Sequence, residues 1–533
     1  MIEQPVRRAE WLAVLASCFA ASAVAVLWSW RHDAMLNYGD AVAHMHIARR
    51  VFDSHRPGLT QLGSVWLPLP HLLLIPFVAV YSWWANGIAG MIPSALAFLA
   101  ACSGLYRLAR RWLRPLPAAV TLVFFASNPN LLYLQTTAMT EPLFLCEMIW
   151  IAVLLVEWRS AVESSRRKSD RLLWWLSLIL IAAIFTRYDG WVLAFFAWTA
   201  IGIVLLGLGR LRSRAFWLAT ILVAAAPVVW CVYNSLAFGD WLSFARGPYS
   251  AHAIELRTSV GPGPPHPGWH NPWVSLVFFV KAAEMDTASL AWGNLLLAFS
   301  LLGTIWGWLI ARRRAFSWIL FLWLPVPFYA YAVSYGSVPI FLPVWWPHSF
   351  YNTRYGMELL PALALGLGFG AHFFLGAARE FKPRWTTAAA AILFALIGIN
   401  FTGMLRQRPV TYVESLTNIE ARRPFEQQIP PLLRALLARH PGGVILMDTS
   451  AYPQIVAFTG IPLRQTINES DKQFYRAALA APARHAAIVL AFDGDPIDRA
   501  VRAHPEGLTR VRSFQSPGQP AATVYVSSTS HEI

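Results

Sequence analysis

Charged side chains are scarce in this sequence: 13% of its 533 residues are Asp, Glu, Lys or Arg, whereas 56% are hydrophobic. Soluble domains have about 25% charged residues, so a soluble globular protein is excluded. Acidic residues are the scarcer kind, 28 against 43 basic ones, for a net charge of +15. The basic residues lie between hydrophobic segments, so we assign them to a membrane topology and expect no nucleic acid partner.

Cysteine is equally sparse. The four cysteines, Cys18, Cys102, Cys146 and Cys231, all fall inside apolar stretches, where a free thiol behaves as a small buried hydrophobe. The sequence therefore indicates neither a disulfide framework nor a cysteine-based metal site. It also lacks an internal repeat of about 20 to 50 residues, which argues against a solenoid.

Long hydrophobic runs, in contrast, fill most of the chain. The first begins after Arg7 and Arg8 and has no small-residue cleavage pattern, so we expect a retained span rather than a signal peptide. We predict an α-helical polytopic membrane protein with about 11 transmembrane helices, because about 11 runs reach roughly 17 to 25 apolar residues. They lie near 11–30, 85–106, 116–132, 139–158, 172–186, 190–208, 215–236, 287–310, 316–335, 357–377 and 385–404.

Basic residues are concentrated in every second connection between these runs. Loops rich in Lys and Arg face the cytoplasm, and an error of one span would invert every later loop. We therefore place the N-terminus in the cytoplasm and predict a multi-pass protein of the cell's inner (plasma) membrane. The basic residues of the predicted cytoplasmic connections are Arg7, Arg8, Arg107, Arg110, Arg111, Arg114, Arg159, Arg166, Arg167, Lys168, Arg171, Arg210, Arg212, Arg214, Arg312, Arg313, Arg314, Arg379, Lys382 and Arg384.

The opposite connections carry fewer basic residues and more acids, histidines, tryptophans and prolines. They include two long outer loops, 31–84 and 239–286, and such loops above a helical scaffold are where functional sites usually form. The apolar stretch Val65–Trp84 would break the charge alternation if it were a span. We predict instead a re-entrant or surface-lying segment on the outer face.

The composition becomes that of a soluble domain towards the C-terminus. We predict a transmembrane domain over 1–404 and a small extracytoplasmic (periplasmic or extracellular) α/β domain over 405–533, which an odd number of spans places outside. Short apolar runs predict its elements: strands at Val444–Asp448, Ala487–Phe492 and Ala522–Ser527, and a helix at Pro431–His440.

The first outer loop begins with a predicted amphipathic helix that carries Asp40 and His44. These two residues are four apart and therefore share one helical face, which we expect to face a cavity or water. Helix capping is the structural alternative for Asp40. For His44 and the neighbouring His46, hydrogen bonding at the interface is favoured over metal ligation, because two histidines and one aspartate are a weak metal signal.

Three further residues lie at outer ends of predicted spans. Glu141 precedes a proline at the start of the fourth span, where a helix-start acid is the alternative to a catalytic or substrate-binding role. Arg187 and Asp189 lie in the turn between the fifth and sixth spans and could simply pair with each other. An arginine near membrane depth on the side poor in positive charge is nevertheless a candidate functional residue.

Two more outer connections add cations and aromatic residues. The second long outer loop carries Arg246 and Lys281, and the connection before the tenth span carries His348, Arg354 and Tyr355. A snorkelling side chain is the alternative for Arg354. We take all five as candidate substrate-binding residues, together with His44, Arg187 and Asp189.

Acids and cations that converge from separate outer loops suit transfer from a lipid phosphate donor. A carboxylate can deprotonate an acceptor hydroxyl, while arginines neutralise the charge on a departing phosphate. The outer-loop histidines leave a divalent metal as an open alternative, and no other cofactor is indicated.

These motifs resemble the GT-C superfamily of membrane glycosyltransferases, especially its family 39-like branch of protein mannosyltransferases and the aminoarabinose transferase of lipid A. The resemblance covers the architecture of the whole chain. Two departures are the replacement of a frequent second acid by Ala41 and of a Lys-Pro-Pro segment by Trp66–Pro70, which argues against the aminoarabinose enzymes' particular substrate. The segments that carry the resemblance are Gly39–Arg50, Pro57–Gly58, Gln61–Gly63, Met139–Glu141, Thr186–Gly190 and Asn352–Gly356.

The resemblance implies a hexosyl- or pentosyltransferase that moves a sugar from a polyprenyl phosphate to a lipid, glycan or protein acceptor, with inversion. It further implies that Asp40 is the general base, that Glu141 orients donor or acceptor, and that Arg187 and Arg354, with Arg246 or Lys281, bind the phosphate.

Two other classes of protein remain as alternatives. A lipid-sugar transporter or flippase predicts ionisable residues near the membrane midplane and two related halves. A noncatalytic membrane assembly protein predicts that Asp40 and Glu141 are dispensable.

Overall fold

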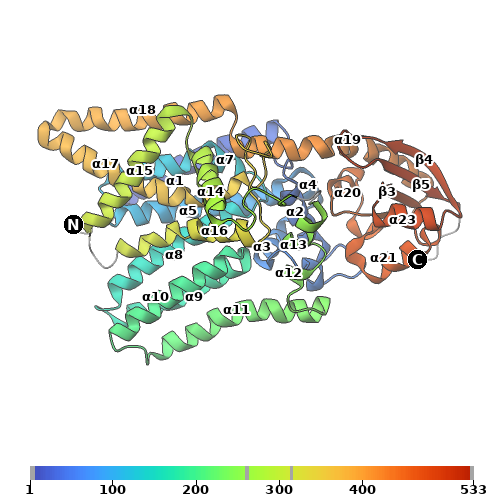
Figure 1. Ribbon diagram of the computed structural model, residues 1–533, viewed down its shortest axis with the longest axis horizontal. Coiled ribbons are helices and arrows are strands. Elements are labelled where there is room, and N and C mark those ends of the chain that lie inside the picture. The colour runs from blue at the N-terminus through green and yellow to red at the C-terminus, as the bar shows by residue number, and fades with distance from the viewer. Residues whose placement is uncertain (1–5, 259–262, 312–315, 529–533) are drawn as a thin grey trace.

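The computed structural model describes residues 6–258, 263–311 and 316–528. Long helices run side by side through most of the molecule, and a small sheet domain lies at one end of them (Figure 1). Helices suit a membrane because they satisfy every backbone hydrogen bond within the segment. The predicted fold class, a polytopic helical membrane protein with a small C-terminal α/β domain, is confirmed.

Each predicted span coincides with a helical segment. Among the described residues, nine segments are long and apolar enough to cross a membrane. The other two predicted spans are α6, which has only 12 residues, and α8, which carries several charged residues. The helices of the bundle are α1 (Arg8–Arg31), α5 (Ile88–Arg110), α6 (Pro115–Ala126), α8 (Glu141–Ala161), α9 (Arg166–Thr186), α10 (Asp189–Gly207), α11 (Arg214–Phe238), α15 (Leu290–Ala311), α16 (Pro325–Tyr335), α17 (Leu360–Phe381) and α18 (Pro383–Gln407).

Short helices occupy the predicted outer loops. Several begin with proline at the first turn, where its missing N–H costs nothing. The segment Val65–Trp84 forms two helices, neither long enough to be a span candidate. The short helices between the spans are α2 (Gly39–Arg50), η1 (Leu59–Leu62), α3 (Pro68–Val78), α4 (Tyr81–Asn86), α7 (Pro129–Leu134), α12 (Ser243–Arg246), α13 (Ala251–Thr258) and α14 (Pro272–Thr287). Two further short helices, η2 (Phe316–Trp323) and η3 (Thr353–Leu359), begin the span segments that continue into α16 and α17.

The C-terminal domain is a five-stranded sheet of order β2-β1-β3-β5-β4. The strands β2, β1 and β3 are parallel to one another, and β5 runs antiparallel to both of its neighbours, β3 and β4. In the centre of the sheet Leu446 of β1 pairs with Val489 of β3. Three strands were predicted, whereas the two-residue β2 and the exposed β4 were not. The elements are α19 (Val410–Arg439), β1 (Ile445–Met447), α20 (Gln454–Thr459), η4 (Leu463–Gln465), β2 (Thr466–Ile467), η5 (Glu469–Asp471), α21 (Gln473–Ala480), α22 (Pro482–His485), β3 (Ile488–Phe492), α23 (Pro496–Ala503), β4 (Leu508–Phe514) and β5 (Ala522–Ser527).

This domain rests on the loop 31–84, the first of the two predicted outer loops. The Asp53 carboxylate accepts hydrogen bonds from the backbone N–H groups of Leu463 and Arg464. From the same loop, the Tyr81 hydroxyl donates to the carbonyl of Ala457 at 2.8 Å. The long helix α19 joins the domain to the end of α18 (Figure 1).

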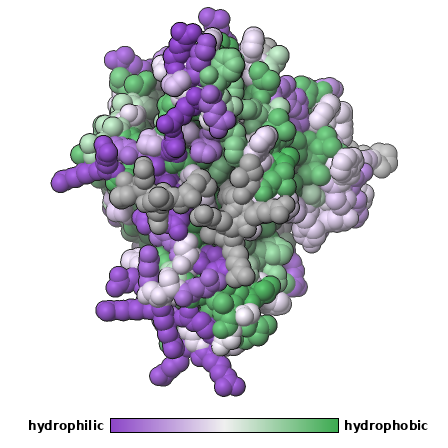
Figure 2. Space-filling model, turned by 90° about the vertical axis from the view of Figure 1, so that its left-hand side faces the viewer, coloured by the Kyte–Doolittle hydropathy of each residue, from purple (hydrophilic) through white to green (hydrophobic). Residues whose placement is uncertain are grey.

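The start of α1 and the sheet domain lie at opposite ends of the molecule (Figure 1). Figure 2 shows the end that holds the start of α1, and hydrophilic side chains project from it between apolar ones. Exposed basic side chains at the connections of this end include Arg107 and Arg166. Arg312, Arg313 and Arg314 of the predicted cytoplasmic set lie outside the described residues.

Candidate active site

Asp40 lies in the first turn of α2, directly after the N-cap residue Tyr38 and Gly39. Its carboxylate makes no capping bond, so the capping alternative is wrong. Instead Oδ2 accepts a hydrogen bond from Nη2 of Arg354 at 2.8 Å. The Asp40 side chain is 45% exposed, whereas that of Arg354 is 6% exposed.

The helix α2 itself is more enclosed than predicted. Ala41, Met45 and Ala48 share one helical face and are buried, and His44 and His46 on other faces are buried too. The reason is that α3 packs along α2 and covers a helical face that would be exposed to water on an isolated surface helix.

Arg354, in the first turn of η3, is surrounded by three carboxylates from different parts of the chain. Besides Asp40 of α2, its Nε lies 3.0 Å from Oε1 of Glu141 and its Nη1 lies 2.5 Å from Oε1 of Glu414. Glu414, on α19, also accepts from the Thr353 hydroxyl and from the backbone N–H of Asn352. Arg354 is therefore a buried, fully paired cation rather than a snorkelling side chain.

Arg187, at the C-cap of α9, is the centre of a second group of charged contacts, beside the group around Arg354. Its Nε lies 3.0 Å from Oδ2 of Asp189, its Nη2 lies 3.1 Å from Oε1 of Glu358, and its Nη1 lies 3.6 Å from Oε1 of Glu141. The hydroxyl of Tyr329 accepts from Nη2 of Arg187 and donates to Glu358. The predicted pairing of Arg187 with Asp189 is present, as one contact of a larger network.

Glu141 joins the two centres, because the same oxygen lies beside both arginines. Its side chain is 1% exposed. A carboxylate buried to this degree needs charge partners, and the start of α8 supplies a favourable helix terminus as well. In this geometry Glu141 holds the arginines together and has no surface to offer a substrate.

The cluster contains more acids than cations. Asp286, at the end of α14, is fully buried, and burial together with the negative charges of Glu414 and Glu141 raises the pKa of its carboxyl well above the usual range. Asp40 is the one carboxylate of this group with substantial exposure. The other carboxylates, all with side chains or residues at most 6% exposed, are Glu141, Asp189, Asp286, Glu358 and Glu414.

Aromatic rings line the same space. The Tyr355 ring centroid lies 5.0 Å from the guanidinium carbon of Arg187 and 5.2 Å from that of Arg354. It also stacks on Tyr329 at 5.2 Å. Cation–π contacts of this kind are stronger where water is excluded, so the rings restrict both arginines to one arrangement.

His44 lies one helical turn after Asp40 on α2. Burial lowers the pKa of its imidazole to about 4; the Glu141 carboxylate opposes this effect, and the charges of Arg354 and Arg187 add to it. His44 is therefore neutral near pH 7. The structure thus brings together seven of the predicted site residues: Asp40, His44, Glu141, Arg187, Asp189, Arg354 and Tyr355.

Three predicted site residues lie apart from this group. Lys281 pairs with Glu284 on α14 at 2.8 Å, Arg246 is exposed at the end of α12, and the exposed His348 bonds the carbonyl of Pro343. Within the described residues none of the three contacts Arg187 or Arg354. The group, in turn, contains Asp286, Glu358 and Glu414, which sequence reasoning missed.

One of the missed acids left a signal in the sequence. Glu358 is an acid inside an apolar run, four residues after Arg354, and an ionisable residue within a span is a functional candidate by default. Glu414 and Asp286 lie outside the spans among many other polar residues, so nothing in the sequence distinguishes them. Among the described residues, no group of three or more His, Cys, Asp or Glu side chains is arranged to hold a metal ion.

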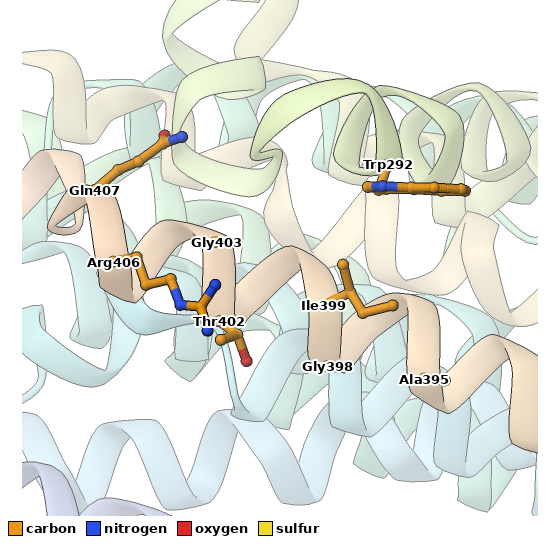
Figure 3. Close-up of a pocket in the computed structure, with 8 residues that line it drawn as sticks. All are labelled: Trp292, Ala395, Gly398, Ile399, Thr402, Gly403, Arg406 and Gln407. Carbon is orange, nitrogen blue, oxygen red and sulfur yellow. The ribbon is translucent and has the colours of Figure 1, made fainter.

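A groove of about 550 Å³ lies on the flank of the bundle between α15 and α18. Trp292 of α15 faces α18 across it, and Arg406 and Gln407 lie towards one end (Figure 3). Gly398, where nothing lies within 4 Å of an added Cβ, leaves the space open. None of the charged residues around Arg187 and Arg354 lines it.

The fold and this charged group together define a multi-pass membrane protein with a buried cluster of acids and arginines where α2, α8, α9, η3 and α19 meet. Two solved structures of ArnT from Cupriavidus metallidurans have a similar fold. The one bound to undecaprenyl phosphate has a TM-score of 0.59 at 13% identity over 97% of this chain and 98% of ArnT. The apo structure has a TM-score of 0.53 at 13% identity over 96% and 98%. No protein-family model and no curated protein matches the sequence.

Proposed function

We propose that the protein is a glycosyltransferase that transfers a sugar from a polyprenyl phosphate donor to an acceptor hydroxyl or amine. One observation carries the proposal. Asp40 offers an exposed carboxylate that Arg354 holds by Oδ2 alone, beside the buried Arg354 and the partly buried Arg187.

The free oxygen of Asp40 would accept the proton of the acceptor. The acceptor oxygen or nitrogen would then form a bond to the anomeric carbon of the sugar while the bond from that carbon to the phosphate oxygen breaks. The electron pair leaves with the phosphate, and the displacement inverts the anomeric centre. A positioned base contributes typically about 10²–10⁴-fold to such a step.

The arginines would stabilise the departing phosphate, as charge-assisted donors do. Arg187 is the better placed of the two, because its side chain is 15% exposed and that of Arg354 is 6% exposed. Glu141 would position both arginines rather than touch the sugar. In this proposal Arg246, Lys281 and His348 have no assigned contact.

The lipid donor is inferred from two sources. The ArnT structure of similar fold is bound to undecaprenyl phosphate, and the grouped charges lie at the outer ends of predicted spans, where a lipid phosphate would be. We place the reaction on the outer face of the inner membrane, with the N-terminus in the cytoplasm and residues 405–533 outside. Hexosyl and pentosyl donors, and lipid, glycan and protein acceptors, all remain within the proposal.

The test is sugar transfer by the purified protein. A panel of radiolabelled polyprenyl phosphate sugars would be offered with membrane extract as the source of acceptors, to wild type and to Asp40→Asn. Asparagine keeps the size of aspartate and removes its basicity. We expect transfer by wild type and a loss of about 10²–10⁴-fold in the folded variant.

Equal transfer by both proteins would remove Asp40 from the chemistry. Donor binding without transfer by wild type would instead favour a lipid-sugar transporter. That alternative predicts charged groups at the middle of the spans, whereas Arg187 lies at the C-cap of α9 and Arg354 lies in the first turn of η3, which precedes α17.

A further inference from the structure

His44 is hydrogen-bonded to a second buried histidine. Its Nδ1 lies 2.8 Å from Nε2 of His71, on α3. Trp66 packs against the same imidazole with ring centroids 4.4 Å apart. Both contacts fix the plane of the His44 ring.

The remaining nitrogens of the two rings differ in their surroundings. Nδ1 of His71 is buried and has no hydrogen-bond partner among the described residues. Nε2 of His44 has no such partner either, but it is not sealed off, although the residue is only 5% exposed. The charged groups that act on this imidazole are Glu141, Arg354 and Arg187.

Two arrangements of protons are compatible with the 2.8 Å contact, because each neutral imidazole has one donor and one acceptor. If His44 donated through Nδ1, His71 would hold an N–H at Nδ1 with nothing to receive it. In the other arrangement His71 donates through Nε2, and His44 keeps its own proton on Nε2. Nδ1 of His71 is unsatisfied in either arrangement, so the cost of an unpaired buried group does not choose between them. A charged phosphate oxygen, which can only accept, selects the arrangement in which His44 donates through Nε2.

The second arrangement adds one more donor to those N–H groups of the arginines that the protein leaves free, since each terminal guanidinium nitrogen carries two N–H groups. Every nitrogen of Arg354 is directed at a carboxylate, and those of Arg187 are directed at carboxylates or hydroxyls of the protein. A phosphate oxygen that carries charge can only accept hydrogen bonds. The Nε2–H of His44 is a donor beside these arginines that no described residue uses.

We infer that His71 fixes His44 as a neutral imidazole whose Nε2–H donates to a phosphate oxygen of the lipid-linked donor. This inference rests on the proposed function for the identity of the ligand. His44 is then a phosphate-binding residue, and His71 is a positioning residue that acts through it. Because burial keeps the pKa of His44 at about 4, the imidazole stays a neutral donor over the whole physiological pH range.

The test compares two lipids that differ only in the phosphate. Equilibrium binding of undecaprenyl phosphate and of undecaprenol would be measured with the purified full-length protein. We expect His44→Phe to bind undecaprenyl phosphate roughly tenfold more weakly, which is the value of a hydrogen bond to a charged group, and to bind the alcohol as wild type does.

His71 is tested by two substitutions. Glutamine can still donate an N–H to Nδ1 of His44, whereas leucine of similar size cannot. We expect His71→Leu to weaken undecaprenyl phosphate binding about three- to tenfold, and His71→Gln to restore most of it. A packing role would lower the affinity for both lipids or would not distinguish the two substitutions.

His46 provides the matched control. It lies on the same helix and is buried, and neither of its ring nitrogens has a partner in the described structure. His46→Leu and His46→Gln should leave the affinity ratio of the two lipids unchanged.

The inference is overturned if folded His71→Leu binds undecaprenyl phosphate as wild type does, or if both lipids lose affinity together. These outcomes are separate from the proposed function, because the binding measurement needs no sugar transfer. Wild type that shows the expected binding pattern but transfers no sugar would refute the proposed function alone.

Discussion

The guanidinium of Arg354 and the carboxylate of Asp40 lie 2.8 Å apart although 314 residues separate them in the chain. The same guanidinium contacts Glu141 and Glu414. One side chain therefore ties α2, α8 and α19 to η3, and the orientation of Asp40 depends on it.

Replacing Arg354 should therefore damage both stability and activity. Arg354→Met leaves the buried carboxylate of Glu414 without its cation and leaves Glu141 with only the more distant Arg187, and breaking a buried pair costs about 3–5 kcal/mol. We expect a clear fall in the thermal unfolding temperature of the detergent-solubilised protein and loss of sugar transfer. Arg354→Lys should recover little, because a lysine cannot reproduce three separate N–H directions.

A second substitution checks the cause. Glu414→Gln added to Arg354→Met removes one of the stranded charges, so the double variant should be more stable than Arg354→Met alone. If the stability losses of Arg354→Met and Glu414→Gln simply added up in the double variant, the two side chains would not be coupled. That result would contradict a stabilising ion pair between Arg354 and Glu414.

Gly356 should tolerate no side chain. An added Cβ would lie 2.4 Å from the backbone nitrogen of Ala283, on α14, and backbone cannot move aside as a flexible side chain can. We expect Gly356→Ala to lower the free energy of unfolding by about 1–3 kcal/mol, as overpacking does, and to reduce transfer by displacing Arg354.

Gly376 is the matched control for this substitution. It lies on α17, in the same continuous helical segment as Gly356, and nothing lies within 4 Å of an added Cβ. Gly376→Ala should be neutral or stabilising by up to about 1 kcal/mol, since alanine favours a helix. Equal unfolding temperatures for the two variants would contradict the close packing of η3 on α14.

The C-terminal domain should lose stability as the pH rises from about 4.5 to about 7. Burial raises the pKa of Glu469 to about 7, and the nearby charge of Asp448 adds to the effect. The folded domain then binds this proton more tightly than the unfolded chain, so deprotonation favours unfolding. We expect a loss on the order of 2 kcal/mol across this window, with little further change above about pH 8.

Amide hydrogen exchange of the β1 and β3 peptides in the full-length protein measures this stability. Protection should fall between pH 4.5 and 7 after correction for the intrinsic exchange rate. Glu469→Gln, which cannot ionise, should flatten the dependence, and a wild-type profile that rises with pH would refute the prediction.

The predicted topology can be tested by labelling with a membrane-impermeant maleimide. Ser164 and Glu506 are exposed, one between α8 and α9 and the other before β4. We expect Glu506→Cys to react in spheroplasts and Ser164→Cys to react only after permeabilisation, because the charge alternation places them on opposite sides. The parent protein is the background control, and the reverse pattern would invert the orientation.

The spans were predictable because hydropathy and loop charge are local properties of the chain. The strands β1, β3 and β5 were predictable for the same reason, since each is a short buried run. The edge strand β4 was not, because most of its residues are exposed and its sequence is polar. The two-residue β2 is defined only by its pairing with β1.

The candidate site was predictable in part. Sequence reasoning found Asp40, Glu141, Arg187 and Arg354 because polar residues at the outer ends of apolar runs are conspicuous. It could not separate them from Lys281 or the other outer cations, which have the same chemistry and the same predicted side of the membrane.

The sequence by itself determined which segments enter the membrane and at which end the polar residues gather, because both follow from the transfer energies of consecutive residues. Only the tertiary structure decided that Glu141 lies between two arginines, that His44 meets His71, and that Asp40 alone of the grouped acids stays exposed. Those facts depend on how α2, α8, η3 and α19 pack together. Contacts between such distant segments are fixed by side-chain fit and burial, which no local pattern encodes.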